Sequence, residues 1–296
     1  MQDDPYLTTE SAAAYLKIKE RKLYELVATG AIPCSKVTGK WLFPRAALDR
    51  WIEAGMARPE GFAPALPPPI VGGSHDPLLE WALRTCGSGL ALLAEGSEAG
   101  LSRLARNEVA IAAIHIHDEI DGEAANERAV GSNSALHDAV VIGFVRREQG
   151  LMVPAGNPRG IGALGDALSG GLRFGLRQKG AGAQLLLEIL LRRAGADVAA
   201  LAVAGGVYPT GADLALGVRS GDVDCGIASR AVAEGAGLTF IPVAWERFDL
   251  AMRRRTYFEA GPQALLAFMR TPDLARHAES LGGYDTREAG RVRMNR

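Results

Sequence analysis

Cysteine is scarce in this sequence, which has only Cys34, Cys86 and Cys225 among its 296 residues. An odd number of widely separated cysteines argues against a disulfide framework and is typical of reduced thiols in a cytoplasm. The chain has neither a CxxC nor an HExxH pattern, so we predict no metal site and no cofactor. We therefore expect a cytoplasmic protein without disulfide bonds.

Long apolar runs and a strong net charge are also missing. Every apolar run is interrupted well short of the roughly 18 residues that a membrane-spanning helix needs. The N-terminus lacks the basic segment, apolar core and cleavage site of an export signal, so we expect no export and no membrane partner. Aromatic residues make up only 6% of the chain, while glycine and alanine are abundant. That composition suits close packing of helices on a sheet, and the length allows two domains.

Two short helices and a tight turn are predicted within residues 1–54. Thr8 or Thr9 can cap the first helix. The second helix is expected over residues 20–29, with Gly30 as its stop. Its apolar positions follow the spacing of one helix face, at Leu23, Leu26 and Val27. A basic hairpin with its turn at Gly39 is expected over residues 37–43.

Basic and polar side chains lie off the apolar positions of the second helix and around the hairpin. Such groups suit contacts with DNA phosphates and base edges. The predicted DNA-binding residues are Lys19, Arg21, Lys22, Tyr24, Lys36, Lys40 and Arg45. Residues 1–58 hold nine lysines and arginines against seven aspartates and glutamates. Because a net of +2 is weak for a DNA-binding domain, we expect a homo-dimer or homo-tetramer.

The motifs LTTxxAAxYL (7–16), LYELVxxGxIP (23–33) and GKWLFPRxxLDRWI (39–52) carry a family resemblance. This stretch resembles the winged helix-turn-helix domain of excisionases, AlpA-type regulators and the heads of MerR-type regulators. The resemblance implies binding to double-stranded DNA. A winged-helix scaffold that contacts proteins instead of DNA is the alternative.

A proline-rich segment separates this domain from the rest of the chain. Residues 55–69 contain five prolines and are predicted to form an extended linker. Beyond it, short apolar runs alternate with amphipathic stretches, which is typical of an α/β architecture. The predicted domains are residues 1–54, the linker 55–69, and a ligand-binding domain over 70–296.

Polar residues follow several predicted strands of the large domain. Ser74, Ser97 and His115 each come directly after an apolar run, and ligands of open parallel sheets bind beyond such strand ends. A glycine-rich turn at residues 178–182 precedes a strongly apolar helix, whose first N–H groups make an anion site. Arg177, immediately before this turn, suits a carboxylate or phosphate.

The stretches GSHD (73–76), GLMVPAGNPxGI (150–161) and RFGLRQKGAGAQLLL (173–187) support a second resemblance. The large domain resembles the type 2 periplasmic-binding-protein fold, and more closely the PBP-like domain found beside MoeA-like and helix-turn-helix modules. The resemblance implies two lobes, with lobe I over about 70–147 and 246–296 and lobe II over about 148–245. The candidate ligand-binding residues are Ser74, His75, Asp76, Ser97, His115, Arg177, Gln178, Gly180, Ala181, Gly182, Thr210 and Asp224.

Several of these residues have a plainer interpretation. Ser74 and Ser97 can be helix caps, His115 can be a buried core histidine, and Arg177 can form a salt bridge between the lobes. Asp76 can be a charge at a helix N-terminus, and the glycines can serve only the turn. Asp224 can stabilise a turn.

The fusion of a DNA-binding domain to a ligand-binding domain favours a one-component transcriptional regulator without catalytic residues. By resemblance, the favoured ligand is a molybdate- or tungstate-type oxyanion. The alternatives are a sensor of the molybdenum cofactor or of a small carboxylate or phosphate metabolite, and an enzyme of molybdenum-cofactor biosynthesis. A recombination factor of the excisionase kind is disfavoured by the large second domain.

Overall fold

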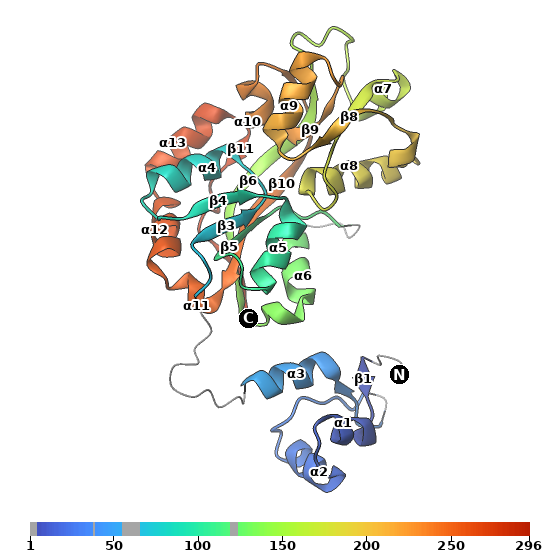
Figure 1. The fold of residues 1–296 in the computed structure, drawn as a ribbon, viewed down its shortest axis with the longest axis vertical. Coiled ribbons are helices and arrows are strands. Elements are labelled where there is room, and N and C mark those ends of the chain that lie inside the picture. Colours follow the sequence, from blue (N-terminus) through green and yellow to red (C-terminus); the bar gives the residue numbers. More distant parts are fainter. Residues whose placement is uncertain (1–4, 38, 55–65, 119–123) are drawn as a thin grey trace. The chain divides into compact units, whose positions relative to one another are not determined.

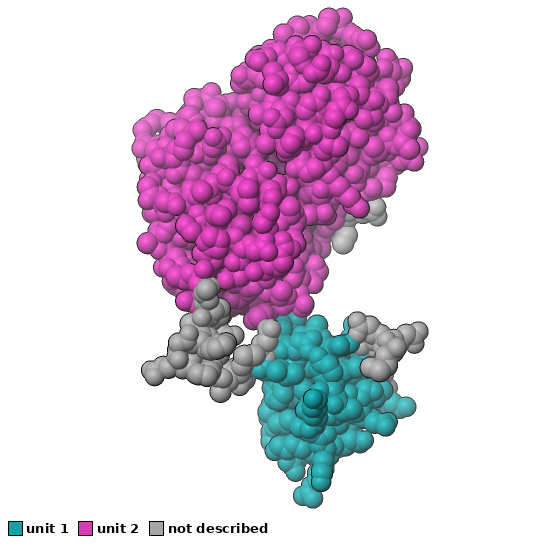
Figure 2. Space-filling view, in the orientation of Figure 1, with its two compact units in different colours: residues 1–65 teal, residues 66–296 magenta. Residues whose placement is uncertain are grey.

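The chain divides into two compact units, residues 1–65 and 66–296 (Figure 2). The computed structural model describes residues 5–37, 39–54, 66–118 and 124–296. Most of the predicted linker, residues 55–65, lies outside the described residues. Among the described helices, none combines the length and the hydropathy that crossing a bilayer requires.

The first unit is a helix-turn-helix with a short strand pair. Its elements are β1 (Tyr6–Leu7), α1 (Thr9–Tyr15), α2 (Glu20–Ala28), β2 (Phe43–Pro44) and α3 (Arg45–Ala54). The hydroxyl of Thr8 accepts a hydrogen bond from the N–H of Ser11, which confirms the predicted cap. Gly30 follows α2 with a φ of +66°. Ser35 and Leu42 form an antiparallel bridge where the hairpin is predicted.

The second unit is a two-lobed α/β domain (Figure 1). The elements of lobe I are β3 (Ile70–Gly73), α4 (Pro77–Thr85), β4 (Ala91–Ala94), α5 (Ser97–Ala105), β5 (Ile111–Ile114), α6 (Ala125–Ser132), the 3-10 helix η1 (Ser134–Leu136), α11 (Arg254–Tyr257), α12 (Ala260–Phe268), α13 (Pro272–Leu281), β11 (Tyr284–Asp285) and β12 (Val292–Asn295). The elements of lobe II are α7 (Leu164–Ser169), β7 (Arg173–Arg177), α8 (Gly182–Arg193), the 3-10 helix η2 (Val198–Ala200), β8 (Ala202–Tyr208), α9 (Gly211–Ser220), β9 (Gly226–Ser229) and α10 (Arg230–Gly235). Two long strands, β6 (Ala139–Val153) and β10 (Thr239–Arg253), run through both lobes.

The main sheet has the strand order β11-β6-β10-β5-β3-β4. Strand β3 is parallel to β4 and β5, whereas β10 is antiparallel to both β5 and β6. In lobe II, β7 and β8 form a parallel pair, and β9 pairs with β6. Parallel strands of lobe I therefore end at the same edge, where α4 and α5 begin.

The structure corrects one sequence prediction about the strands. The sequence predicts separate strands over residues 140–144 and 150–158, but 139–153 form a single strand. The polar residues 145–149 stay extended because their backbone pairs with β10, with Arg147 opposite Glu246. Strand pairing thus overrides the polar composition of this segment.

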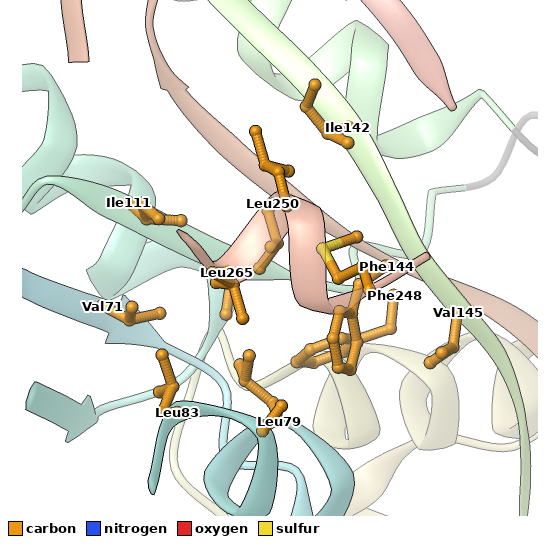
Figure 3. Packing of buried hydrophobic residues seen from close by; sticks show 14 of the residues in the cluster. Val71, Leu79, Leu83, Ile111, Ile142, Phe144, Val145, Phe248, Leu250 and Leu265 are labelled. Atoms are coloured by element: carbon orange, nitrogen blue, oxygen red, sulfur yellow. The ribbon is translucent and has the colours of Figure 1, made fainter. Parts of the chain in front are cut away.

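Each lobe has its own hydrophobic core. In lobe I, Phe144 and Phe248 pack with Leu79, Leu250 and Leu265 between the sheet and helices α4 and α12 (Figure 3). In lobe II, a separate cluster is built around α8, β7 and the far ends of β6 and β10, and includes Leu151, Phe174, Leu187 and Ile241. The polar middle of β6 and β10 lies between these two cores.

We predict that Phe144→Ala destabilises the second unit by about 3–5 kcal/mol, because Phe144 is fully buried and its ring lies 6.0 Å from that of Phe248. Denaturant unfolding of the full chain, followed by circular dichroism, measures the change. Phe258→Ala is the matched control, since Phe258 is 72% exposed, and it should change the free energy of unfolding by about 0.5 kcal/mol or less. Equal effects of the two substitutions would contradict the assigned core.

Candidate functional site

The residues predicted to contact DNA lie on the surface of the first unit. Six of them are exposed, namely Lys19, Arg21, Lys22, Tyr24, Lys36 and Lys40, and Arg45 is half-buried against the ring of Tyr15. On α2, Arg21 and Lys22 lie 3.6 and 3.2 Å from carboxylate oxygens of Glu25. Such exposed ion pairs contribute little stability, so these cations remain available to phosphates.

In the second unit, a small cavity lies between the lobes. Its lining residues are Ser74, His75, His115, Arg147, Gln149, Arg177, Ala183, Gly211, Ala228, Ser229 and Val232. The cavity volume is about 20 Å³. Since one water needs about 10–15 Å³ by the same kind of measure, the space suits a small ion better than an organic molecule.

The lobes contact each other at this cavity. The N–H of Glu98 on α5 donates to the carbonyl of Gly180, with an N–O distance of 3.2 Å. A Cβ placed on Gly182 would come within 2.0 Å of the carbonyl oxygen of His115. Glycine at position 182 therefore permits the start of α8 to approach lobe I, and the structure is that of a closed cleft.

Ser74, Ser97 and His115 come together as the sequence predicts from the strand ends. The Oγ atoms of Ser74 and Ser97 are 2.9 Å apart, and Ser97 Oγ accepts from the backbone N–H of His115 at 3.0 Å. Only Ser74 and His115 line the cavity, because Ser97 is fully buried behind them. Ser97 thus orients the hydroxyl of Ser74, which faces the cavity.

Arg177 brings a positive charge to the cavity. Its Nε and Nη2 donate to the carbonyls of Tyr208 and Pro209 at 2.9 and 2.8 Å. Among the described residues, no carboxylate forms an ion pair with it. Burial, and secondly the charge of Arg147, lower the pKa of Arg177 to about 10, so the guanidinium stays protonated at neutral pH. The 205–210 stretch therefore positions Arg177 through backbone groups.

The start of α8 supplies backbone donors beside this guanidinium. Its N-cap residue, Ala181, has no side-chain cap, and neither does Gly96 at the start of α5. Uncapped first-turn N–H groups and the helix dipole favour an anion. In contrast, Thr210 caps α9 through a reciprocal pair of hydrogen bonds with Asp213, so its side chain is already engaged.

Sequence reasoning missed a buried charged network on the two long strands. Arg147 Nε donates to Glu246 Oε1 at 2.7 Å, and Arg147 Nη1 donates to Asp76 Oδ2 at 2.7 Å. Gln149 Nε2 also donates to Glu246 Oε1 at 2.8 Å. Burial disfavours the charge of Arg147, but Glu246 and Asp76 outweigh it and raise its pKa. The sequence signal that could have indicated this network is the spacing of two residues between Arg147 and Gln149, which places both side chains on one face of a strand.

His115 joins the same network through its ring. Nδ1 lies 3.1 Å from Oε2 of Glu246. Burial lowers the pKa of His115 to about 4, although Glu246 opposes the shift, so the ring is neutral at pH 7. Burial alone would raise the pKa of Glu246, but the charge of Arg147 and the hydrogen bonds with His115 and His117 hold it well below its usual range. Ser229, which ends β9 and lines the cavity, was missed as well.

Two predicted ligand-binding residues lie away from the cavity. Asp76 is the N-cap of α4, where its Oδ1 accepts from two backbone N–H groups while Oδ2 binds Arg147. Asp224 pairs with Arg173, at the opposite end of β7 from Arg177. Both carboxylates are therefore used by structural contacts. Gln178, Gly180 and Ala181 in the turn before α8, Gly182 at its first position and Thr210 before α9 are also not among the lining residues.

Comparisons with known proteins agree with this architecture. The protein YvgK of Bacillus subtilis (strain 168), described as uncharacterized, is 24% identical over 311 residues and covers 99% of both chains. A putative phosphate-transporter substrate-binding protein from Clostridium perfringens has a TM-score of 0.55 at 12% identity, over 73% of this chain and 98% of its own. A tungstate transporter protein from Geobacter sulfurreducens has a TM-score of 0.51 at 14% identity, over 71% and 98%. These structures share the fold.

A structure of OxyR from Corynebacterium glutamicum, a cysteine mutant with bound H2O2, extends over more of the chain. It matches 93% of this chain and 89% of its own, with a TM-score of 0.51 at 15% identity. A helix-turn-helix domain model matches residues 6–56, and a PBP superfamily domain model matches residues 81–270. Since the second match covers more than half of the sequence, the chain belongs to the periplasmic-binding-protein-like (PBP) superfamily, with a helix-turn-helix domain at its N-terminal end.

Proposed function

We propose that the protein is a one-component transcriptional regulator whose cleft binds a small oxyanion, with molybdate or tungstate as the favoured ligand. The observation that carries the proposal is a protonated Arg177 without a carboxylate partner, beside a closed cavity of about 20 Å³. Arg177 is half-buried, and although the charge of Asp213 acts on it, no carboxylate pairs with it directly, so an anionic ligand would supply the direct partner.

The other groups at the cavity support an anion. Ser74 and Ser229 offer hydroxyl donors, and the uncapped start of α8 offers backbone N–H groups. Hydroxyl and amide donors bind an oxyanion without fully neutralising it, and their positions select its geometry. Among proteins of this fold, one is described as a tungstate transporter and another has phosphate bound. Phosphate is therefore the nearest competitor of molybdate and tungstate.

The cavity disfavours the larger alternatives. A molybdenum cofactor, with its large organic part, needs much more room than about 20 Å³, whereas a small carboxylate is similar in size to an oxyanion and has to be separated from it by experiment. An enzymatic triad from Ser74, His75 and Asp76 is also disfavoured. His75 Nε2 contacts Glu80 Oε2 at 2.9 Å and Asp76 caps α4, so the three side chains do not form a hydrogen-bonded series.

Control of DNA binding requires that the ligand prefer one of two states of the regulator. The closed cleft joins donors from both lobes, namely Ser74 from lobe I and Arg177 from lobe II. A ligand that contacts both lobes binds the closed state more tightly than an open one and shifts the population towards closure. This shift in population then changes the affinity of the helix-turn-helix domain for DNA.

A thermal-shift screen of the full chain tests the ligand. Molybdate or tungstate at about 100 times its dissociation constant should add about 2.7 kcal/mol, whereas sulfate and small carboxylates should give no shift. Phosphate as the strongest ligand would keep the oxyanion site but replace the favoured ion. A shift with carboxylates alone would contradict the oxyanion assignment.

Substitution at the cavity should weaken that binding. We expect Arg177→Met to raise the dissociation constant of the oxyanion about 10- to 100-fold, because the substitution removes a charge-assisted hydrogen bond from the site. Arg219→Met is the matched control, because Arg219 is exposed on α9, and it should leave the constant unchanged. Isothermal titration calorimetry on both variants makes the comparison. An unchanged dissociation constant of the oxyanion in Arg177→Met would contradict the proposed site.

DNA binding is tested with duplexes selected from a random-sequence library by the full-length protein. The double substitution Arg21→Ala and Lys22→Ala should weaken DNA binding. The slope of the logarithm of the binding constant against the logarithm of the salt concentration should become shallower by about one unit for each phosphate that is no longer neutralised. Arg276→Ala, an exposed position on α13, is the control. If the wild-type protein selects no duplex with or without oxyanion, the regulator assignment fails.

A further inference from the structure

Three side chains with metal-ligating atoms gather in the wall of the cleft. His115 and His117 follow β5 at alternate positions, and Glu246 lies on β10, the antiparallel neighbour of β5. Oε2 of Glu246 lies 3.1 Å from Nδ1 of His115 and 2.6 Å from Nε2 of His117. One ligand atom from each residue lies within 4.8 Å of the other two. We propose that His115, His117 and Glu246 bind a divalent transition metal ion of the zinc class.

The donor set matches the coordination chemistry of zinc. Two imidazole nitrogens and one carboxylate oxygen are the three protein ligands of open, four-coordinate zinc sites. Bonds of about 2.0–2.1 Å at tetrahedral angles separate ligand atoms by about 3.3 Å. The distance from Glu246 Oε2 to His115 Nδ1, 3.1 Å, is close to this value, whereas the distance to His117 Nε2, 2.6 Å, is about 0.7 Å shorter, so the ring of His117 has to move outward to admit the ion.

The surrounding contacts hold Glu246 in an orientation suited to an ion. Its Oε1 accepts from Arg147 and Gln149 at 2.7 and 2.8 Å. Oε2 lies 2.6 Å from His117 Nε2, and His115 Nδ1 lies between the two oxygens, 3.0 Å from Oε1 and 3.1 Å from Oε2. Hydrogen bonds of this kind to the distal oxygen orient a ligating carboxylate and raise the affinity for the metal. The ligand arrangement is therefore pre-formed by β6 and β10.

The charge balance of the buried group also favours a cation. Arg147 is in contact with two carboxylates, those of Asp76 and Glu246, and all three side chains are at most 3% exposed. One guanidinium cannot neutralise two carboxylates. A metal ion at Oε2 supplies positive charge where the excess negative charge lies.

The site has room for an entering ion and for a fourth ligand. His117 and Glu246 line a second pocket, of about 230 Å³, between lobe I and helix α8. Asp118, Asn126 and Arg193 also line this pocket. His115, on the other side, lines the anion cavity. The metal would thus lie between the two spaces, with its open position towards the larger one and a water molecule as fourth ligand.

Metal occupancy would act on the cleft through His115. The backbone N–H of His115 donates to Ser97 Oγ, which contacts Ser74 Oγ. An ion that fixes the ring of His115 therefore also fixes the serine pair at the anion cavity. This coupling rests on the proposed oxyanion function, whereas the metal site itself does not.

The test titrates chelator-treated full-length protein with Zn2+ in a calorimeter, without any oxyanion. We expect one equivalent of Zn2+ to bind. Loss of a residue that only supports a metal ligand weakens metal binding by roughly 10- to 100-fold, and His117→Gln, which removes a ligand, should weaken Zn2+ binding by more than that. His117 is the best position for substitution because its side chain is 17% exposed. His277→Gln is the matched control, since His277 stacks on Trp81 away from the cluster, and it should bind Zn2+ like the wild type.

Two results would overturn the site. One is the absence of stoichiometric Zn2+ binding by the wild-type protein, and the other is unchanged affinity in His117→Gln. Co2+ in place of Zn2+ gives a second readout that does not depend on a variant that folds. Visible bands without thiolate charge transfer support the histidine and carboxylate ligands, whereas a thiolate band assigns the ion to Cys34, Cys86 or Cys225 and contradicts the proposal.

Discussion

The pairing of β6 with β10 is the constraint on which the second unit depends. These strands stay hydrogen-bonded over residues 139–153 and 239–253, so one ladder belongs to both lobes. The two cores lie at either end of this ladder, and the polar residues lie at its middle. Because both lobes share it, this ladder connects lobe I directly to lobe II.

The polar middle of the ladder is costly to bury and therefore has to be paired internally. Arg147 contacts Glu246 on the opposite strand and Asp76 at the start of α4, so it connects the strand pair to a cleft helix. Removing one partner would leave a buried charge uncompensated. The network is weak evidence for stability as such, but it fixes the orientation of the groups that surround the cleft.

Closure and cavity size are linked by the small residues of the 178–182 turn. Gly182 allows α8 to touch His115, and Gly180 accepts a hydrogen bond from α5. With the lobes in contact here, the cavity volume is about 20 Å³. Arg177 lies at this cavity, half-buried and without a directly paired carboxylate. The size of the cavity and the charge of Arg177 are the two features on which the proposed oxyanion ligand rests.

Local sequence signals were sufficient for the first unit and for the strand ends. The Thr8 cap and the stop at Gly30 each depend on residues within one helical turn. Patterns of apolar residues likewise located β3, β5 and the Gly-rich turn before α8. The motifs of both domains led to the PBP superfamily and the helix-turn-helix, and the domain models match them.

The sequence by itself determined the two folds and the serine and histidine positions after the strands. Only the tertiary structure decided which polar groups meet. Glu246 lies 131 residues from His115 and 99 residues from Arg147 in the sequence, so no local spacing motif predicts their contact. The prediction of no metal site rested on such local motifs alone. Likewise, Asp76 pairs with Arg147 and Asp224 pairs with Arg173, and no local motif predicted either pair. Strand register and packing determine which charged groups meet.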